Sequence, residues 1–150
     1  MVATECGLDR PELGETMTDY RVLCVDDNRD CADSTAMLLQ LMGFETEACY
    51  DSTLAIHAND TFQPEVCFID LNMPQMDGDV LARKLRTWNH WQPKLLIAIT
   101  AMSNDASTAR IAAAGFDMHL VKPVGPEDFE EAVATIRRVL ESYPVLRDSQ

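Results

Sequence analysis

The chain has 150 residues, 47% hydrophobic and 25% charged, which is the length and composition of one globular domain with a sizeable core. Its formal net charge of −13 argues against a nucleic-acid-binding surface, since phosphate contacts need clustered Lys and Arg. No apolar run of about 18 residues occurs, and the five cysteines form no C-x-x-C pair, so we expect a cytoplasmic protein with reduced thiols and no membrane segment.

The chain divides into three parts by composition. Residues 1–19 are rich in polar residues and proline and show no apolar periodicity, so we expect a flexible leader or linker there. Residues 20–143 carry all the periodic apolar segments and are expected to form the folded domain. Residues 144–150 are then a short tail.

Five strand–helix units are predicted within the domain. The apolar runs predict strands at 20–25, 44–50, 66–70, 94–100 and 116–121. Helices are expected at 29–42, from a Ser52 cap to about 59, at 78–86, from a Ser103 or Asn104 cap to 114, and from Pro126 through 140. The second strand is partly polar and is placed nearer the sheet edge. Short connections make the strands parallel, with helices on both faces of a doubly wound α/β sheet.

Some charged and aromatic residues are interpreted as structural. Arg110 and Arg137 fall on helix faces that the charge pattern indicates are solvated. Trp88, His90 and Trp91 are expected to cover the end of the third helix, with a partner surface as the alternative. None of these residues is assigned to a functional site.

Polar residues follow the predicted strands at one edge of the sheet. Asp26 and Asp27 follow the first strand, Asp70 ends the third, Thr100 ends the fourth and Lys122 follows the fifth. Neighbouring carboxylates repel one another unless a cation joins them, and oxygen ligands suit Mg²⁺, so the pattern predicts a Mg²⁺ site. A lysine and a hydroxyl can bind phosphoryl oxygens there, and an aspartate can accept the phosphoryl group. The alternative for Asp70 is a turn or helix-capping acid.

Four motifs carry a resemblance to a known family. They are Val25-Asp26-Asp27, the run from Ile69-Asp70-Leu71-Asn72-Met73-Pro74 to Gly78, Ile99-Thr100-Ala101, and Leu120-Val121-Lys122-Pro123. Over about residues 20–143 the chain resembles the receiver domain of two-component response regulators. The resemblance implies a flavodoxin-like (βα)5 fold with strand order 2-1-3-4-5.

The resemblance also implies roles for the residues at the strand ends. Asp70 would be the phosphoacceptor. Asp27 and Asp70 would bind Mg²⁺ directly with the main-chain carbonyl of Asn72, and Asp26 would act through a water. Thr100 and Lys122 would contact the phosphoryl group. The loop geometry would rest on Pro74, Gly78 and Pro123, with the Lys122–Pro123 bond in cis.

The function implied is a phosphoacceptor rather than a turnover enzyme. The phosphoryl group would come from a histidine kinase or a histidine phosphotransfer protein, and a homodimer through the last strand and its flanking helices is a candidate assembly. His119 stands where the family usually has Tyr or Phe, and its segment resembles receivers of hybrid sensor kinases. Two alternatives are a phosphatase with an aspartyl-phosphate intermediate, disfavoured by Asn72, and a flavin-binding module, disfavoured by the acids at Asp26 and Asp27.

Overall fold

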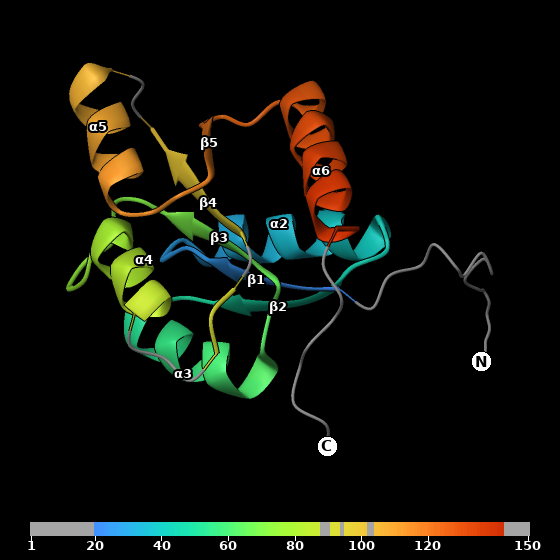
Figure 1. The fold of residues 1–150 in the computed structure, drawn as a ribbon, viewed down its shortest axis with the longest axis horizontal. Helices are drawn as coiled ribbons and strands as arrows, with labels where there is room; N and C mark the ends of the chain where they lie inside the picture. The colour runs from blue at the N-terminus through green and yellow to red at the C-terminus, as the bar shows by residue number, and fades with distance from the viewer. Residues whose placement is uncertain (1–19, 88–90, 94, 102–103, 143–150) are drawn as a thin grey trace.

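The computed structural model describes residues 20–87, 91–93, 95–101 and 104–142, and these form one parallel sheet with helices on both faces (Figure 1). The strands are β1 (Arg21–Val25), β2 (Glu45–Cys49), β3 (Val66–Asp70), β4 (Leu95–Thr100) and β5 (Met118–Val121). The helices are α2 (Arg29–Leu41), α3 (Ser52–Phe62), α4 (Gly78–Thr87), α5 (Asp105–Ala113) and α6 (Pro126–Leu140). The strand order is β2-β1-β3-β4-β5, which confirms the expected doubly wound topology. The expected leader and tail lie outside the described residues.

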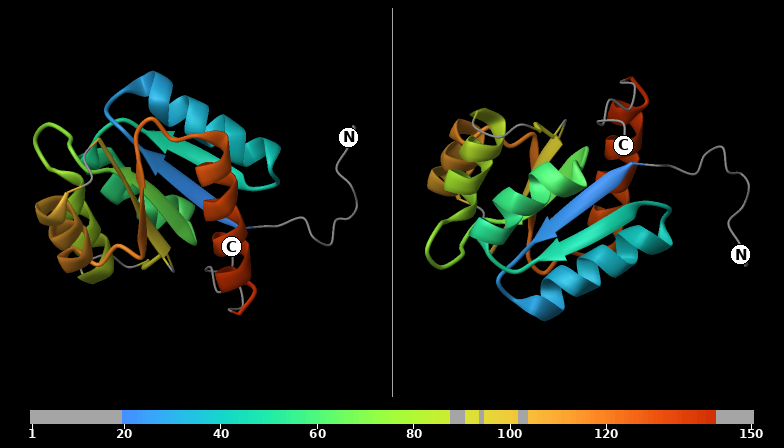
Figure 2. Two further views of the ribbon diagram at one scale, coloured as in Figure 1. Left: turned by 90° about the horizontal axis from the view of Figure 1, so that it is seen from above. Right: turned by 90° about the horizontal axis from the view of Figure 1, so that it is seen from below.

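Two hydrophobic cores hold the helices to the sheet. Helices α3, α4 and α5 cover one face, where residues such as Ala55, Leu81 and Ile111 pack against side chains of the strands. Helices α2 and α6 cover the other face through residues such as Leu39 and Ile136 (Figure 2). The arrowheads of the strands all point the same way in Figure 2, so every strand ends at one edge of the sheet.

The burial of each strand follows its place in the sheet. Every residue of β3 and β4 is buried, as expected for strands covered on both faces. Strand β2 at one edge is mostly exposed or half-buried, which confirms its predicted edge position. Strand β5 at the other edge is half-buried throughout. It begins at Met118, two residues later than predicted, because Asp117 turns its carboxylate back to accept a hydrogen bond from Leu96 N at 2.8 Å.

The start of α3 differs from the prediction. The capping residue is Asp51, whose extended backbone lets its carboxylate accept a hydrogen bond from Leu54 N at 2.8 Å. Ser52 lies inside the first turn, is buried, and donates its hydroxyl to Met76 O at 2.8 Å. The helix also continues to Phe62, past the predicted end near 59. The cap of α5 is Asn104, one of the two residues predicted.

Arg137, predicted to be solvated, and Trp91, predicted to cover a helix end, both make specific contacts within the fold. Arg137 was predicted to be solvated, but its guanidinium stacks on Phe44 and donates to Met42 O. Trp91 is buried and donates its indole N–H to Pro64 O at 2.6 Å, so the ring fills space in the fold. The two other residues of that predicted patch, 88 and 90, lie outside the described residues.

None of the helices within the described ranges has the length and apolar character needed to cross a lipid bilayer.

Candidate functional site

Three carboxylates meet at the carboxyl edge of the sheet. Val25 pairs with Ile69 in the parallel register of β1 and β3, so Asp26 and Asp70, the next residues of the two segments, lie side by side. One carboxylate oxygen from each of Asp26, Asp27 and Asp70 lies within 4.8 Å of the others. Asp26 and Asp70 are buried and Asp27 is exposed, so the cluster opens to solvent on one side.

This donor set fits a hard divalent cation. Mg²⁺ binds oxygen at about 2.0–2.1 Å in an octahedron, so its ligand oxygens lie roughly 3–4 Å apart. The three carboxylate oxygens lie within 4.8 Å of one another, which is close to this spacing, so their chemistry and placement suit such an ion. Within the described residues this is the one group of three or more His, Cys, Asp or Glu that brings its ligand atoms together.

Lys122 provides the positive charge at the site. Its Nζ lies 3.2 Å from Asp26 Oδ2 and 3.5 Å from Asp70 Oδ1. Burial lowers the pKa of Lys122, but the carboxylates of Asp70 and Asp26 outweigh that effect and the net shift is upward. Lys122 is therefore a permanent cation beside two acids. The Lys122–Pro123 peptide bond is cis, as the resemblance implied.

The carboxyl group of Asp70 has a raised pKa. Burial raises its pKa to about 6, and the negative charges of Asp26 and Asp27 act in the same direction. Lys122 and a backbone hydrogen bond from Asn72 oppose the rise. A cation bound between the three carboxylates would offset this repulsion and favour the ionised form of Asp70. Asp70 does not cap a helix, because it ends β3 and the next helix begins at Gly78. Its hydrogen bond from the backbone of Asn72 is the contact that the turn alternative expected, and it is compatible with a functional role.

Thr100 is the last residue of β4 and is fully buried. The strand holds it through pairing with Val121 of β5, and its carbonyl accepts from Lys122 N at 2.8 Å. Thr100 and Lys122 are thus tied to one another by the backbone. His119 pairs with Ala98 in the same register, so it faces the side of the sheet that Thr100 also faces, and it is half-buried.

The loop from Leu71 to Asp77 connects the end of β3 to α4 and closes on itself. Gly78 N donates to Leu71 O at 2.9 Å. A Cβ at Gly78 would lie only 2.3 Å from the carbonyl oxygen of Asp70, so no other residue fits there without movement of the backbone. The absence of a side chain at Gly78 therefore lets the start of α4 lie directly against the backbone of Asp70. Pro74 lies in the same loop, and its carbonyl accepts from Met76 N.

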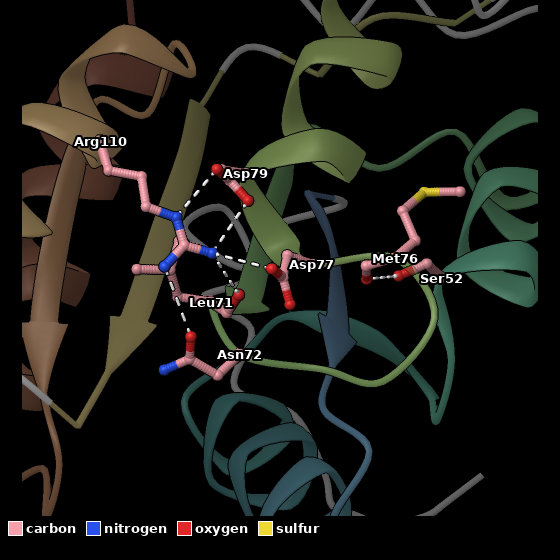
Figure 3. A network of polar contacts seen from close by, with 7 residues as sticks. All are labelled: Ser52, Leu71, Asn72, Met76, Asp77, Asp79 and Arg110. Carbon is pink, nitrogen blue, oxygen red and sulfur yellow. Dashed lines mark hydrogen bonds and ion pairs between the residues drawn. The ribbon is translucent and has the colours of Figure 1, made fainter.

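Arg110 also reaches this loop, although the charge pattern predicted it to be solvated. From α5 its guanidinium binds both carboxylate oxygens of Asp79 at 2.9 and 3.1 Å, and Asp77 at 3.2 Å (Figure 3). The hydrogen bond from Arg110 lowers the pKa of Asp79. No sequence spacing signalled this contact, because the partners lie 31 residues apart on different helices.

The fold and the site together define a class. A doubly wound flavodoxin-like sheet carries a cluster of three carboxylates, a buried threonine and a lysine at its carboxyl edge. Residues 22–134 match the model of the response regulator receiver domain, and the chain belongs to this family.

Curated relatives and solved structures agree with this membership. The chain is 32% identical over 126 residues to the transcriptional regulatory protein PrrA of Mycobacterium tuberculosis, covering 83% of this chain and 51% of PrrA. It is 30% identical over 129 residues to the sensor histidine kinase GacS of Pseudomonas protegens, covering 83% of this chain and 14% of GacS. The chain therefore spans about half of PrrA and a small part of GacS. The chemotaxis protein CheY4 of Vibrio cholerae superposes with a TM-score of 0.73 at 27% identity, covering 82% of this chain and 100% of CheY4.

Proposed function

We propose that Asp70 accepts a phosphoryl group from a phosphohistidine in a Mg²⁺-dependent transfer, and that the protein is a signalling switch rather than a turnover enzyme. The observation that carries the proposal is the cluster of Asp26, Asp27 and Asp70 beside Lys122. Three acids around one lysine leave negative charge that a divalent cation would balance. Asp27 and Asp70 would hold the ion with the main-chain carbonyl of Asn72, and Asp26 through a water.

The transfer balances as a displacement at phosphorus. A carboxylate oxygen of Asp70 forms a bond to phosphorus while the bond to the imidazole nitrogen of the donor breaks, and the imidazole leaves with that electron pair. Bound Mg²⁺ would neutralise the charge that spreads over the phosphoryl oxygens. Lys122, now near Asp26, is in reach of the same oxygens, and Thr100 can donate its hydroxyl to one of them.

The donor in this proposal is a protein, a histidine kinase or a histidine phosphotransfer protein. A cavity of about 1060 Å³ lies between α2 and α6 and includes Asp26 and Lys122 in its lining. Leu38 and Leu41 of α2 line the same cavity and are 49% and 79% exposed. An exposed apolar surface next to a site that must receive another protein's phosphohistidine suits a docking surface for that donor.

The readout of the phosphorylated state would lie around the β5 edge of the sheet, and it would share α6 with the cavity. Phosphorylation adds charge and acceptor oxygens at Asp70, and Thr100 is expected to turn toward them. His119 faces the same side of the sheet from β5 and would follow. The readout surface is therefore α5, β5 and α6, and only a small population shift between two packings is needed.

The central experiment is covalent labelling. Incubation with acetyl phosphate and Mg²⁺ is expected to add one acid-stable, base-labile phosphoryl group, seen by intact-mass analysis, and chelation of the metal is expected to abolish it. Asp70→Asn should take no label. Asp27→Ala should need much more Mg²⁺ for the same labelling, because it removes a direct ligand. Undiminished labelling of Asp70→Asn would refute the assignment.

A further inference from the structure

The loop of residues 71–77 is held from two sides by helices that are not its neighbours in the chain. On one side Ser52 of α3 donates its hydroxyl to Met76 O at 2.8 Å. On the other side Arg110 of α5 contacts Asp79 at the start of α4 and Asp77 in the loop (Figure 3). The loop carries Asn72, whose main-chain carbonyl is the third direct Mg²⁺ ligand in the proposed function. Both anchors therefore act on the position of a metal ligand.

The Arg110 anchor has the geometry of a strong contact. The guanidinium binds Asp79 with two hydrogen bonds of 2.9 and 3.1 Å, and the side chain of Asp79 is only 12% exposed. Bidentate, charge-assisted pairs of this kind are stronger and more directional than ordinary surface ion pairs. Asp77, at 3.2 Å, is more exposed and adds a second, weaker partner on the loop itself.

The remaining donors of Arg110 point at the residues that follow Asp70. Nη2 lies 3.5 Å from Leu71 O and Nη1 lies 3.5 Å from Asn72 Oδ1. These two contacts are long and therefore weak, but they show that the guanidinium is oriented toward the start of the loop. One guanidinium thus contacts both the first turn of α4 and the start of the loop. A movement of Asn72 would therefore change the contacts of Arg110.

Arg110 also belongs to the helix that follows Thr100. Helix α5 begins at Asp105, five residues after the end of β4 at Thr100. Leu71 N donates to Ile99 O at 2.8 Å, so the loop and the end of β4 are already joined by the backbone on the inner side. Arg110 adds a second connection, between α5 and the residues at the end of the loop. A displacement of α5 in the readout must therefore either carry the loop with it or break the pair with Asp79.

We propose that Arg110 is a positioning residue that couples α5 to the 71–77 loop, so that the occupancy of the phosphoryl and Mg²⁺ site and the position of α5 are energetically linked. Arg110 holds the loop where the Asn72 carbonyl faces the ion, and it passes the rearrangement at Asp70 to the helix. It touches neither the phosphoryl group nor the metal. This inference rests on the proposed function.

The test uses beryllofluoride with Mg²⁺ as the phosphoryl mimic, followed by NMR of the full chain. Replacing Arg110 by Ala is expected to weaken beryllofluoride binding about five- to tenfold, the size of a typical coupling between sites. The beryllofluoride-induced amide shifts of residues 105–113 are expected to shrink, while those of Asp70 and Lys122 persist. Arg110→Lys keeps the charge but cannot form the bidentate pair, so it should lie between the wild type and Ala. Arg83→Ala removes an exposed arginine of α4 and serves as the matched control.

Asp79→Asn completes a double-mutant cycle. If Arg110 acts through Asp79, the variant with both substitutions should bind beryllofluoride no more weakly than Arg110→Ala alone. A purely structural role would lower the melting temperature but leave the α5 response to beryllofluoride at its wild-type size. Equal affinity and equal α5 shifts in the wild type, Arg110→Ala and Arg110→Lys would overturn the inference alone. A wild-type protein that binds no beryllofluoride would overturn the proposed function as well.

Discussion

Lys122 and Asp26 form the closest ion pair of the site, with Nζ 3.2 Å from Oδ2, while the same Nζ lies 3.5 Å from Asp70 Oδ1. The lysine is thus shared between an acid that would bind the metal through water and the acid that would be phosphorylated. Because Lys122 opposes the rise in the pKa of Asp70, its charge keeps part of the Asp70 population ionised and nucleophilic near neutral pH.

Substituting Lys122 with Met is therefore expected to raise the pKa of Asp70 further above its value of about 6. The carboxyl carbon of Asp70, followed by NMR during a pH titration of the metal-free protein, measures this directly. Lys84→Met, on the last turn of α4, is the control and should leave the titration unchanged. An Asp70 titration that stays in place in Lys122→Met would show that the ammonium does not act on this carboxyl.

The raised pKa of Asp70 makes the stability of the metal-free protein depend on pH. An unfolded chain releases this proton near pH 3.8, whereas the folded protein holds it until about pH 6. The contribution of Asp70 to the free energy of unfolding is therefore expected to fall as pH rises from about 4 to about 6, and the full penalty persists above that range. Asp70→Asn removes the penalty, so it should be more stable than the wild type by about 1–3 kcal/mol at pH 7.5 and nearly equal to it at pH 4.

Urea unfolding in the presence of a chelator measures this difference, and adding Mg²⁺ should then stabilise the wild type but not Asp70→Asn. A wild type that gains stability between pH 4 and pH 6 relative to Asp70→Asn would contradict the sign.

Gly78→Ala is expected to destabilise the protein by about 2 kcal/mol or more. The new Cβ would lie 2.3 Å from the carbonyl oxygen of Asp70, and a backbone atom cannot rotate out of the way as a side chain can. Gly125→Ala is the matched control. Its Cβ would meet nothing nearer than Asp128 Oδ2 at 3.9 Å, so it should cost under about 1 kcal/mol, the usual effect at a helix N-cap. Equal losses in urea unfolding would mean that the loop has room for a methyl group.

The switch is expected to appear on one side of the molecule. With beryllofluoride and Mg²⁺, amide shifts should extend from the Asp70 loop into α5, β5 and α6. His119→Tyr should enlarge them, because a larger aromatic ring changes its packing more when Thr100 moves. Shifts restricted to the Asp70 loop in both proteins would leave a passive phosphate carrier.

The exposed apolar residues of α2 should matter for a protein donor only. Leu38→Ser with Leu41→Ser is expected to slow transfer from a phosphorylated kinase severalfold, while acetyl phosphate, which needs no docking surface, should label Asp70 at the wild-type rate. Leu54→Ser removes a similarly exposed leucine from α3, away from that cavity, and should affect neither donor. Equal slowing with both donors would place the effect in the site and not in docking.

Much of the fold was predictable because short sequence signals mark where its helices and strands begin and end. The apolar run before Asp70, the glycine after each of two helices and the proline of α6 all mark element ends within a few residues. Parallel strands bring their carboxyl ends together, so the sequence alone predicts that Asp26 and Asp70 lie side by side.

Contacts between distant helices were not predictable in the same way. Arg110 and Arg137 carry the charge pattern of solvated residues, and only the tertiary packing of α5 on α4 and of α6 beside the end of α2 gives them partners. Likewise Asp51 and Ser52 are both suitable helix-capping residues. Asp51 is the cap in the structure, because the Ser52 hydroxyl donates to Met76 O, 24 residues away. Local propensity cannot choose when a long-range hydrogen bond takes the hydroxyl.

The burial of the sheet has a practical consequence for its thiols. Burial raises the pKa of Cys49 to about 12 and also raises the pKa values of the buried thiols of Cys24 and Cys67, so these three stay protonated and enclosed near neutral pH. Of the four cysteines in the described ranges, Cys31 alone is half-exposed, and it lines the cavity that includes Asp26 and Lys122. Within this part of the chain an alkylating fluorophore would therefore attach at Cys31, beside Asp26 and Lys122, without any engineered cysteine, and would report on changes in that cavity.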